Sequence, residues 1–465
     1  MIVTFSVSNF RSFFNRETLS LVPSEKRPLD DGHVVSFGAD SLSVLRTSVV
    51  YGANGAGKSN LFQALKSLRD LATGRIMATD RYRLRSFAFA RETEQKDETT
   101  FDIQFVSGKV LYRYFLAISS ERAVIEEEEL SKFTAGDYQT VFVRERNDRS
   151  STANVSFGRG FLGKPSKRLD ALAVVGAPAE KTFLSSIASN MDMEVEEIGT
   201  DIANTLKWFG ELLLISPDDS IRSLLDAYRD ERVRLFASRL LEAASGVSQM
   251  VIDKTTLDEH SLRELIRPDI ADKAIHELSE TKHPASIVMR DHHGSEIQID
   301  RLEGGSFGKF ELKAQHALED GRIGDLEISQ ESDGTKRLIE LIPALYDLVY
   351  KNRVGMIDEV ERSMHPLLCR AFLRSFVEYG GSGQLILSTH ADGLLDDKLL
   401  RRDEVWFVEK DISAQSHLYS LNEFKERHKA TLRQYYFQGR YGAIPFGFDS
   451  PSELLSESTE DNKHA

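Results

Sequence analysis

The chain has 465 residues and is 41% hydrophobic, which is enough to form the cores of two or three domains. Its formal net charge is −14, so the field of the whole molecule repels nucleic acid and only a local basic surface could bind it. The single cysteine excludes an intrachain disulfide, and no apolar run approaches the roughly 18 residues of a membrane span. The N-terminal residues show no secretory signal, so we expect a cytoplasmic protein with no membrane partner.

Strand-like segments dominate the first third of the chain. Alternating or β-branched patterns predict strands at 2–7, 16–22 and 44–51, and helical spacing predicts a helix at 59–72. Between about residues 83 and 157 five more strand-like segments follow closely on one another, beginning with 83–90, which predicts an antiparallel sheet. We interpret the four consecutive glutamates at 126–129 as a solvated strand end or turn.

The middle of the chain has a different pattern. Residues 179–245 are predicted to be mostly helical, with Ser216 as the N-cap and Pro217 at the first position of one helix. A β-hairpin is predicted at 286–300, with two adjacent histidines in its turn. No heptad pattern persists over three or four repeats, so we expect no long coiled-coil arms.

The segment GANGAGKS, residues 52–59, matches the pattern G-x-x-x-x-G-K-[ST] between a predicted strand and a predicted helix. Its glycines let backbone N–H groups surround phosphates, and the N-terminus of the next helix adds positive potential. Lys58 would reach the β- and γ-phosphates of ATP, and the Ser59 hydroxyl would ligate Mg²⁺. The candidate nucleotide-binding residues are Asn54, Gly55, Gly57, Lys58, Ser59 and Asn60.

A second phosphate-related element lies about 300 residues later, where an apolar strand ends in Asp358 and Glu359. An acid at the end of a buried strand beside a phosphate loop is placed to hold Mg²⁺ through water, and we assign this role to Asp358. The next acid, Glu359, is placed to orient or deprotonate the attacking water. A surface acidic turn is the alternative interpretation.

Another apolar strand, residues 385–387, leads to His390. A histidine at the end of such a strand can donate to a γ-phosphate and so distinguish ATP from ADP, and we count His390 with Glu359 as a catalytic candidate. A structural role is the usual alternative for a lone histidine.

The fourth element is a small polar loop, Ser332 to Thr335, that opens a strongly amphipathic helix. A loop of this kind at a helix start is an anion site. Because it carries neither the lysine nor the preceding strand of a phosphate loop, it makes sense as half of a site that another subunit completes. Its candidate residues are Ser332, Gly334 and Thr335.

These four elements, in this order, resemble the ABC-type ATPase head shared by SMC proteins, RecF and the OLD nucleases. ESDGTKRL at 331–338 resembles the family's signature loop, and ERSMHP at 361–366 resembles its D-loop. The resemblance implies an α/β fold, with a mixed sheet flanked by helices, an antiparallel β lobe and an inserted, mostly helical middle region. It also implies an ATPase that uses ATP and Mg²⁺ and that forms a homodimer, or a higher even-numbered oligomer, around ATP. The family's Q-loop glutamine is not located, and Gln104 and the segment 213–220 are its candidates.

On the basis of this resemblance, we divide the chain into three regions. Residues 1–160 form an N-terminal ATPase lobe with the phosphate loop and an antiparallel β subdomain. Residues 161–310 form the inserted region, and residues 311–465 form a C-terminal lobe with the signature loop, the Asp-Glu pair and the switch histidine.

The two ends of the chain narrow the resemblance further. MIVTFSVSNFRSFFNRETLSLVPS at the start and EVWFVEKD with QGRYGAIPF near the end resemble the ATPase of two-gene abortive-infection systems of the RloA or AbiLi type. This resemblance implies a regulatory switch that senses phage, through a phage protein or nucleic acid, and controls a separately encoded effector, a RloB-like Toprim protein. Glu409 resembles the first metal ligand of a Toprim nuclease, but too few residues and acids follow it, so we expect no nuclease activity in this chain.

Two other functions remain open at this stage. One is a DNA-repair or recombination ATPase of the RecF or SMC kind, which would clamp duplex DNA in an ATP-dependent dimer. The other is a scaffold that binds ATP and hardly turns it over. DNA-stimulated, salt-sensitive ATPase activity would favour the first, and a turnover assay would identify the second.

Overall fold

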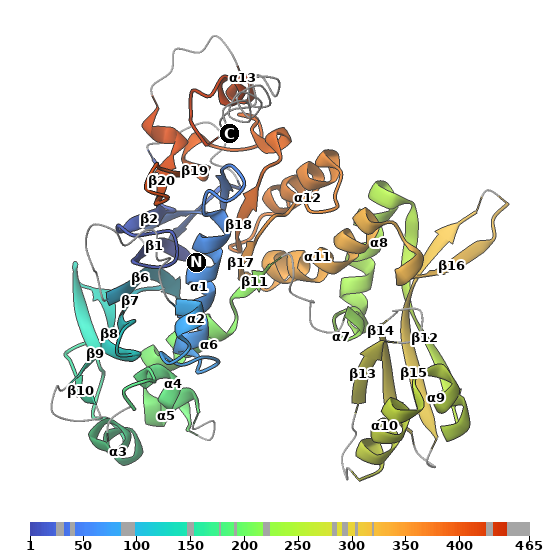
Figure 1. The fold of residues 1–465 in the computed structure, drawn as a ribbon, viewed down its shortest axis with the longest axis horizontal. Coiled ribbons are helices and arrows are strands. Elements are labelled where there is room, and N and C mark those ends of the chain that lie inside the picture. The colour runs from blue at the N-terminus through green and yellow to red at the C-terminus, as the bar shows by residue number, and fades with distance from the viewer. Residues whose placement is uncertain are drawn as a thin grey trace, which may run out of the picture. The chain divides into compact units, whose positions relative to one another are not determined.

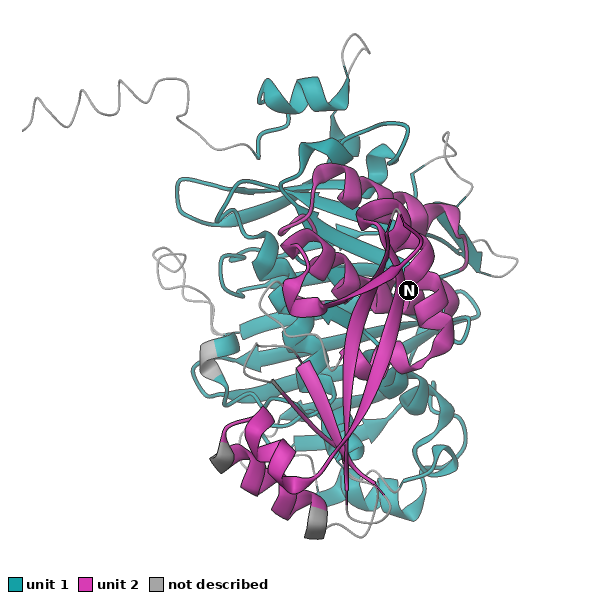
Figure 2. Cartoon of the chain, turned by 90° about the vertical axis from the view of Figure 1, so that its right-hand side faces the viewer, with its two compact units in different colours: residues 1–214, 353–359, 382–465 teal, residues 215–352, 360–381 magenta. Residues whose placement is uncertain are grey.

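Two units share the chain, and each is assembled from segments that are distant in sequence (Figure 2). Unit 1 comprises Met1–Leu214, Arg353–Glu359 and Ser382–Ala465, and unit 2 comprises Ile215–Asn352 and Val360–Gly381. Unit 1 therefore contains residues from both sides of the inserted region, whereas unit 2 contains part of that region and residues that follow it. The boundaries inferred from the sequence, after residues 160 and 310, fall inside unit 1 and unit 2 respectively.

The computed structural model describes most of the chain (Figure 1). The described residues are 1–24, 32–37, 42–84, 98–146, 153–175, 178–189, 193–216, 224–280, 286–290, 296–302, 306–318, 320–424 and 431–443. The predicted helix start at Pro217 and the hairpin-turn histidines His292 and His293 lie outside the described residues.

A six-stranded sheet in unit 1 carries the phosphate loop. Its strands, in spatial order, are β11 (Leu213–Ile215), β17 (Val354–Ile357), β18 (Gln384–Thr389), β5 (Thr47–Tyr51), β19 (Val405–Lys410) and β20 (Ser416–Ser420). The pairs β17–β18, β18–β5 and β5–β19 are parallel, and β20 at the edge is antiparallel to its neighbour β19. Every residue of β17, β18 and β5 is buried, as expected for parallel strands covered on both faces.

A seven-stranded antiparallel sheet forms the second layer of unit 1. Its strands, in spatial order, are β10 (Ala153–Phe157), β9 (Asp137–Arg146), β8 (Val124–Thr134), β7 (Val110–Ser119), β6 (Glu98–Ser107), β1 (Ile2–Ser8) and β2 (Glu17–Ser20). One apolar core contains side chains of both sheets and of α1 (Lys58–Ala72), including Leu61, Leu65 and Leu68. The buried Gln384 amide joins the sheets, because it accepts from Ile2 N–H at 2.6 Å and donates to Ile2 O at 2.9 Å.

Short elements complete unit 1. They are the hairpin β3 (Val34–Phe37) and β4 (Leu42–Leu45), and the helices α2 (Arg81–Leu84), α3 (Lys167–Val175), α4 (Phe183–Ala188), α5 (Val195–Ile198), α6 (Thr200–Gly210) and α13 (Leu432–Phe437). The strand predicted at 83–90 is wrong at its start, because Arg83 and Leu84 belong to α2, and its remainder lies outside the described residues.

The predicted solvated end at 126–129 is wrong. The four glutamates lie within β8, and Glu128 is fully buried. Its carboxylate accepts from the backbone N–H of Phe183 at 2.5 Å, from the N–H of Leu184 at 3.1 Å and from the Tyr114 hydroxyl at 2.9 Å. Burial raises the pKa of Glu128, an effect that the neighbouring Arg144 and these hydrogen bonds oppose. Glu128 is thus a structural acid that secures the start of α4 against the sheet.

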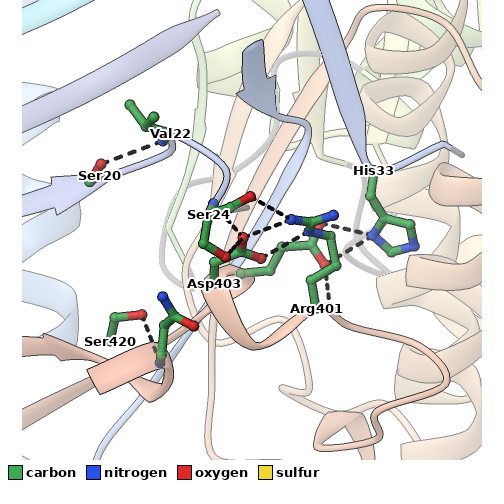
Figure 3. Close-up of polar contacts among 9 residues, drawn as sticks. Ser20, Val22, Ser24, His33, Arg401, Asp403 and Ser420 are labelled. Atoms are coloured by element: carbon green, nitrogen blue, oxygen red, sulfur yellow. Dashed lines mark hydrogen bonds and ion pairs between the residues drawn. The ribbon is translucent and has the colours of Figure 1, made fainter. Parts of the chain in front are cut away.

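A buried polar cluster joins the N-terminal segment to the segment that follows β18 (Figure 3). Arg401 donates to Asp403 through two nitrogens, at 2.9 and 2.8 Å, and the Ser24 hydroxyl donates to the same carboxylate at 2.6 Å. His33 Nδ1 lies 2.8 Å from the Glu404 carboxylate. Burial alone would raise the pKa of Asp403, but the hydrogen bonds from Arg401 and Ser24 hold it below its ordinary value. The cluster fixes the backbone of both segments beside the sheet.

Unit 2 combines helices with an antiparallel sheet. Its helices are α7 (Leu224–Arg229), α8 (Glu231–Ser245), α9 (Glu259–Leu265), α10 (Pro268–Glu280), α11 (Asp333–Tyr350) and α12 (Pro366–Glu378). Its strands are β12 (Val247–Leu257), β15 (Phe307–Ala317), β14 (Glu296–Arg301), β13 (Ser286–Arg290) and β16 (Ile323–Glu327). The β13–β14 pair confirms the predicted hairpin. The longest helix of the described residues is α11, with 18 residues, and no helix there is long and apolar enough to cross a membrane.

The expected fold class is confirmed as an α/β protein with a mixed sheet and a separate antiparallel sheet. The predicted helical run after residue 216 is divided. The helix α7 ends at Arg229, and the side chain of Asp230 then caps the N-terminus of α8.

Candidate nucleotide-binding site

Three parallel strands place the predicted catalytic elements of unit 1 at one edge of the six-stranded sheet. The phosphate loop follows β5, Asp358 follows β17, and His390 follows β18. The register pairs Tyr51 with Thr389 and Ile357 with Leu387, so the three strands end at similar heights. Ligands of open α/β sheets bind at the carboxyl ends of the strands, which is where these residues lie.

The phosphate loop has the backbone of an anion cradle. Gly55 and Gly57 have φ values of 75° and 121°, in the region that side chains disfavour, and α1 begins directly after them at Lys58. A Cβ at Gly55 would meet no atom within 4 Å, so this side of the loop is open. Asn54 and Ser59 are exposed, which leaves the Ser59 hydroxyl accessible at the start of the helix.

Lys58 and His390 meet at this edge. The Lys58 side chain is only 4% exposed, and its Nζ donates to the carbonyl oxygens of Gly52 at 2.8 Å and Ala53 at 3.2 Å. The same Nζ lies 3.0 Å from His390 Nε2. The lysine and the histidine that the sequence assigned to the terminal phosphates are therefore neighbours in space, although 332 positions separate them.

Asp358 and Glu359 are linked through a serine that the sequence analysis did not single out. Ser388, at the end of β18, donates its hydroxyl to the Asp358 carboxylate and accepts from Glu359 N–H at 2.9 Å. Asp358 is 3% exposed, whereas Glu359 is partly exposed and has a φ of 49°. The turn thus directs two adjacent acids into different environments.

The residues at this edge suit Mg²⁺. Asp358 offers a carboxylate and Ser59 a hydroxyl, which are hard oxygen donors. Within the described ranges no three His, Cys, Asp or Glu side chains gather as a metal cluster. A magnesium ion bound with a nucleotide needs no such cluster, because it takes one or two protein oxygens together with phosphates and water.

The signature-loop residues belong to unit 2 and form a local structure of their own. Ser332 caps α11 by accepting from Thr335 N–H at 3.1 Å, and the two hydroxyls lie 2.8 Å apart. A Cβ at Gly334 would lie 3.0 Å from the backbone oxygen of Ser363, in the D-loop-like segment, so the two segments are in contact. Ser332 and Asp333 are exposed, as a surface that meets a second molecule requires.

Two further serines contact the phosphate loop and were missed by the sequence analysis. Ser416 donates to the Ala56 carbonyl, and Ser12 lies 2.8 Å from Ser416. Asn60, predicted to bind nucleotide, directs its amide to Ser12 at 2.7 Å. No local pattern could have identified these serines, because they lie 40 residues before and more than 350 after the loop.

The remaining candidates from the sequence are the possible Q-loop residues and the possible metal-binding glutamate, Glu409. Gln104 lies within β6 of the antiparallel sheet, whereas β11, in the other candidate segment, is next to β17. Glu409 accepts from the Tyr419 hydroxyl at 3.1 Å. Burial raises the pKa of the Cys369 thiol to about 12.

The phosphate loop, the strand-terminal acids and the helix-opening signature loop define the class of the protein as an ABC-type nucleotide-binding AAA protein. A family model described as "AAA domain, putative AbiEii toxin, Type IV TA system" matches residues 48–188 and 212–396. The chain belongs to this family. No curated protein matches it in sequence.

Solved structures offer only distant similarity. The SMC head domain from Thermotoga maritima is 14% identical, with a TM-score of 0.38, over 90% of this chain and 98% of that one. A Pyrococcus furiosus Smc head with an extended coiled coil, bound to the C-terminal domain of ScpA, is 11% identical, with a TM-score of 0.36, over 95% and 98%.

Proposed function

We propose that this protein binds and hydrolyses ATP as a dimer and serves as the nucleotide-dependent switch of a bacterial anti-phage system, acting in the cytoplasm on a separately encoded effector. The observation that carries the ATPase part is the convergence of Lys58, Asp358, Glu359 and His390 at one edge of the unit 1 sheet. The family description, with its toxin and toxin–antitoxin system, supports the defence part.

The site residues have distinct proposed roles. The Lys58 ammonium, which now donates to two loop carbonyls, exchanges them for the β- and γ-phosphate oxygens. Ser59 and Asp358 hold Mg²⁺, which neutralises phosphate charge when it is bound. Glu359 orients the attacking water, and His390 contacts the γ-phosphate, so that it registers whether that phosphate is present.

A second copy of the chain completes the site. The N-terminus of α11, at the predicted residues Ser332, Gly334 and Thr335, offers backbone N–H groups to the γ-phosphate of a nucleotide held by the other copy. Ser332 is exposed there, whereas Thr335 is buried and its N–H donates to the Ser332 hydroxyl. Because the γ-phosphate contributes to both halves, ATP favours the closed dimer and hydrolysis releases it. A RloB-like Toprim protein is the proposed effector, and a phage protein or nucleic acid is the proposed trigger.

The biochemical test compares wild-type protein with the Lys58→Ala variant. Wild-type protein should bind MgATP and hydrolyse it, whereas the variant should bind it at least about 100-fold more weakly because two phosphate contacts by a charged group are lost. Isothermal titration calorimetry measures binding and phosphate release measures turnover. Equal affinities for the two proteins would contradict the proposed site.

The biological test uses cells that carry this gene with its neighbouring gene. Plaque counts should fall when both genes are present, and Lys58→Ala should restore them. If expression of this chain alone stops growth, the chain is itself the toxic component and the proposal of a separate effector fails. Steep stimulation of the ATPase by duplex DNA, lost as salt rises, would instead indicate a DNA clamp.

A further inference from the structure

The phosphate loop is connected by hydrogen bonds to side chains of two elements that are distant from it in sequence. Ser416 begins β20, and Ser12 lies in a tight turn after β1. The two serines are 1% and 0% exposed. Ser416 N–H also donates to Ser12 O at 2.8 Å, so the backbones of the two elements are joined independently of their hydroxyls.

The turn that carries Ser12 is rigidly fixed. Phe10 and Phe13 pair through backbone hydrogen bonds of 2.8 and 2.9 Å, and both rings are completely buried. Asn9 and Arg11 have φ values of 52° and 50°, which the surrounding contacts must maintain against the usual preference of side-chain-bearing residues. Ser12 therefore occupies a defined position beside the loop.

Three side chains form a hydrogen-bonded chain that ends at the Ala56 carbonyl. Ser416 Oγ donates to Ala56 O and lies 2.8 Å from Ser12 Oγ, a second acceptor for the same hydroxyl. Ser12 Oγ also accepts from the Asn60 amide at 2.7 Å. Ser12 therefore holds Ser416 Oγ beside Ala56, and the relay links Asn60, Ser12, Ser416 and Ala56.

The end of this relay determines how one peptide of the cradle faces. In a trans peptide the C=O and the following N–H point in opposite directions. When Ser416 draws the Ala56 carbonyl outward, the N–H of Gly57 is turned to the other side of the loop, where phosphate is expected. Contact is close here, because a Cβ at Gly57 would lie 2.3 Å from Ser416 Oγ and 3.0 Å from Ser12 Oγ.

We infer that Ser12 and Ser416 are positioning residues for phosphate binding, which act by orienting the Ala56–Gly57 peptide without touching the nucleotide. This inference rests on the proposed nucleotide site and adds to it a relay that spans the two ends of the chain. Its distinctive feature is that both hydroxyls serve one carbonyl. Loss of either hydroxyl then removes the same effect.

The test uses Ser12→Ala, Ser416→Ala and the double variant in the full chain. The matched control is Ser6→Ala, because Ser6 is also buried, at 5% exposure, and bonds to another hydroxyl, Thr18 Oγ1 at 2.8 Å, away from the loop. Calorimetry with MgATP gives the Kd, phosphate release gives kcat and KM, and melting without nucleotide measures stability.

Each single variant should raise the Kd and KM for MgATP about tenfold, and the double variant should also show about tenfold rather than about 100-fold. The kcat at saturating ATP should change less than KM. The inference is overturned if both variants bind ATP like Ser6→Ala, or if the two effects multiply. If Ser416→Ala lowers the melting temperature without nucleotide far more than Ser6→Ala does, its Kd no longer tests the inference. The Kd of Ser12→Ala, in which no residue of β20 is changed, then decides between the two outcomes. Failure of the wild-type protein to bind ATP would instead refute the proposed function.

Discussion

The phosphate loop of unit 1 and the signature loop of unit 2 are both glycine-containing turns at the start of a helix, yet they are built differently. The phosphate loop is held by groups from outside its own segment, including Ser416 and His390. The signature loop is held by its own cap, Ser332 to Thr335, and by its contact with Ser363. Its outer face is exposed.

This difference indicates which half of the proposed site can bind a nucleotide without the other half. The phosphate loop has its lysine and lies at the same sheet edge as two acids and a histidine, so we expect one chain to bind a nucleotide there. The signature loop has a helix N-terminus, and its charged neighbours Lys336 and Glu331 are paired with Asp333 and His316. Substitutions at the phosphate-loop site should therefore affect binding or chemistry in each chain. Substitutions at the signature loop should leave binding by each chain intact and affect association and the hydrolysis that depends on it.

The largest expected effect is that of Glu359→Gln on hydrolysis. The amide cannot accept a proton from water, so turnover should fall about 10²- to 10³-fold. Binding should persist, because Lys58 and the loop are unchanged, and ATP should trap a dimer that size-exclusion chromatography with light scattering detects. Rapid hydrolysis by this variant would contradict the role of Glu359, and a monomer at saturating ATP would contradict the ATP-dependent dimer.

The next effect separates the two loops directly. Ser332→Asp preserves the N-cap but places a carboxylate where a partner's γ-phosphate would lie, so ATP-dependent dimerisation and hydrolysis should fall about 10- to 100-fold. The Kd of the monomer for ATP should stay within about twofold, since the phosphate loop is intact. Ser332→Asn, which caps equally well without charge, is the control. Unchanged dimerisation of Ser332→Asp would remove the signature loop from the interface.

Glu128 is expected to contribute to the stability of the fold, in contrast to Glu359, which is expected to contribute to hydrolysis. Glu128→Gln replaces one oxygen by an NH₂ group that faces backbone donors, so the free energy of unfolding should fall by about 3 kcal/mol. Glu127→Gln, on the other face of β8, is the control. Partial burial and then Glu129 and Glu145 raise the pKa of Glu127, so its neutralisation should not destabilise. Urea unfolding measures both, and a loss below about 1 kcal/mol for Glu128→Gln would contradict this role.

The smallest expected effect concerns His417, which follows Ser416 in β20. Burial lowers the pKa of His417, but hydrogen bonds to Asp411 and Glu17 raise it above its ordinary value. Its stabilising contribution is therefore full below about pH 6.5 and is lost as pH rises through the higher folded-state pKa. Because the side chain is 41% exposed, water screening keeps the effect within about 1 kcal/mol. His417→Gln should destabilise at pH 6 and less at pH 8 in urea unfolding. An equal loss at both pH values would contradict the assignment.

Local patterns predicted much of the fold and the elements of the candidate site. The phosphate loop, the strands that end at Asp358 and His390, and the capped helix at Ser332 each follow from contiguous residues with recognisable spacing. The prediction for Glu126 to Glu129 failed because charge suggests exposure, whereas Glu128 is buried against donors that lie about 55 residues away. Ser12, Ser388 and Ser416 gain their roles only through long-range contacts, so no local pattern identifies them.

The central claim is that each ATP is held by the phosphate loop of one copy and the signature loop of another. The direct measurement mixes Lys58→Ala with Ser332→Asp protein, each of which should have little activity alone. Mixed dimers contain one intact site, made from the phosphate loop of the Ser332→Asp chain and the signature loop of the Lys58→Ala chain. Mixing should restore ATP-dependent dimers and measurable hydrolysis. If the mixture stays monomeric and inactive under conditions in which wild-type protein dimerises, the shared site is contradicted.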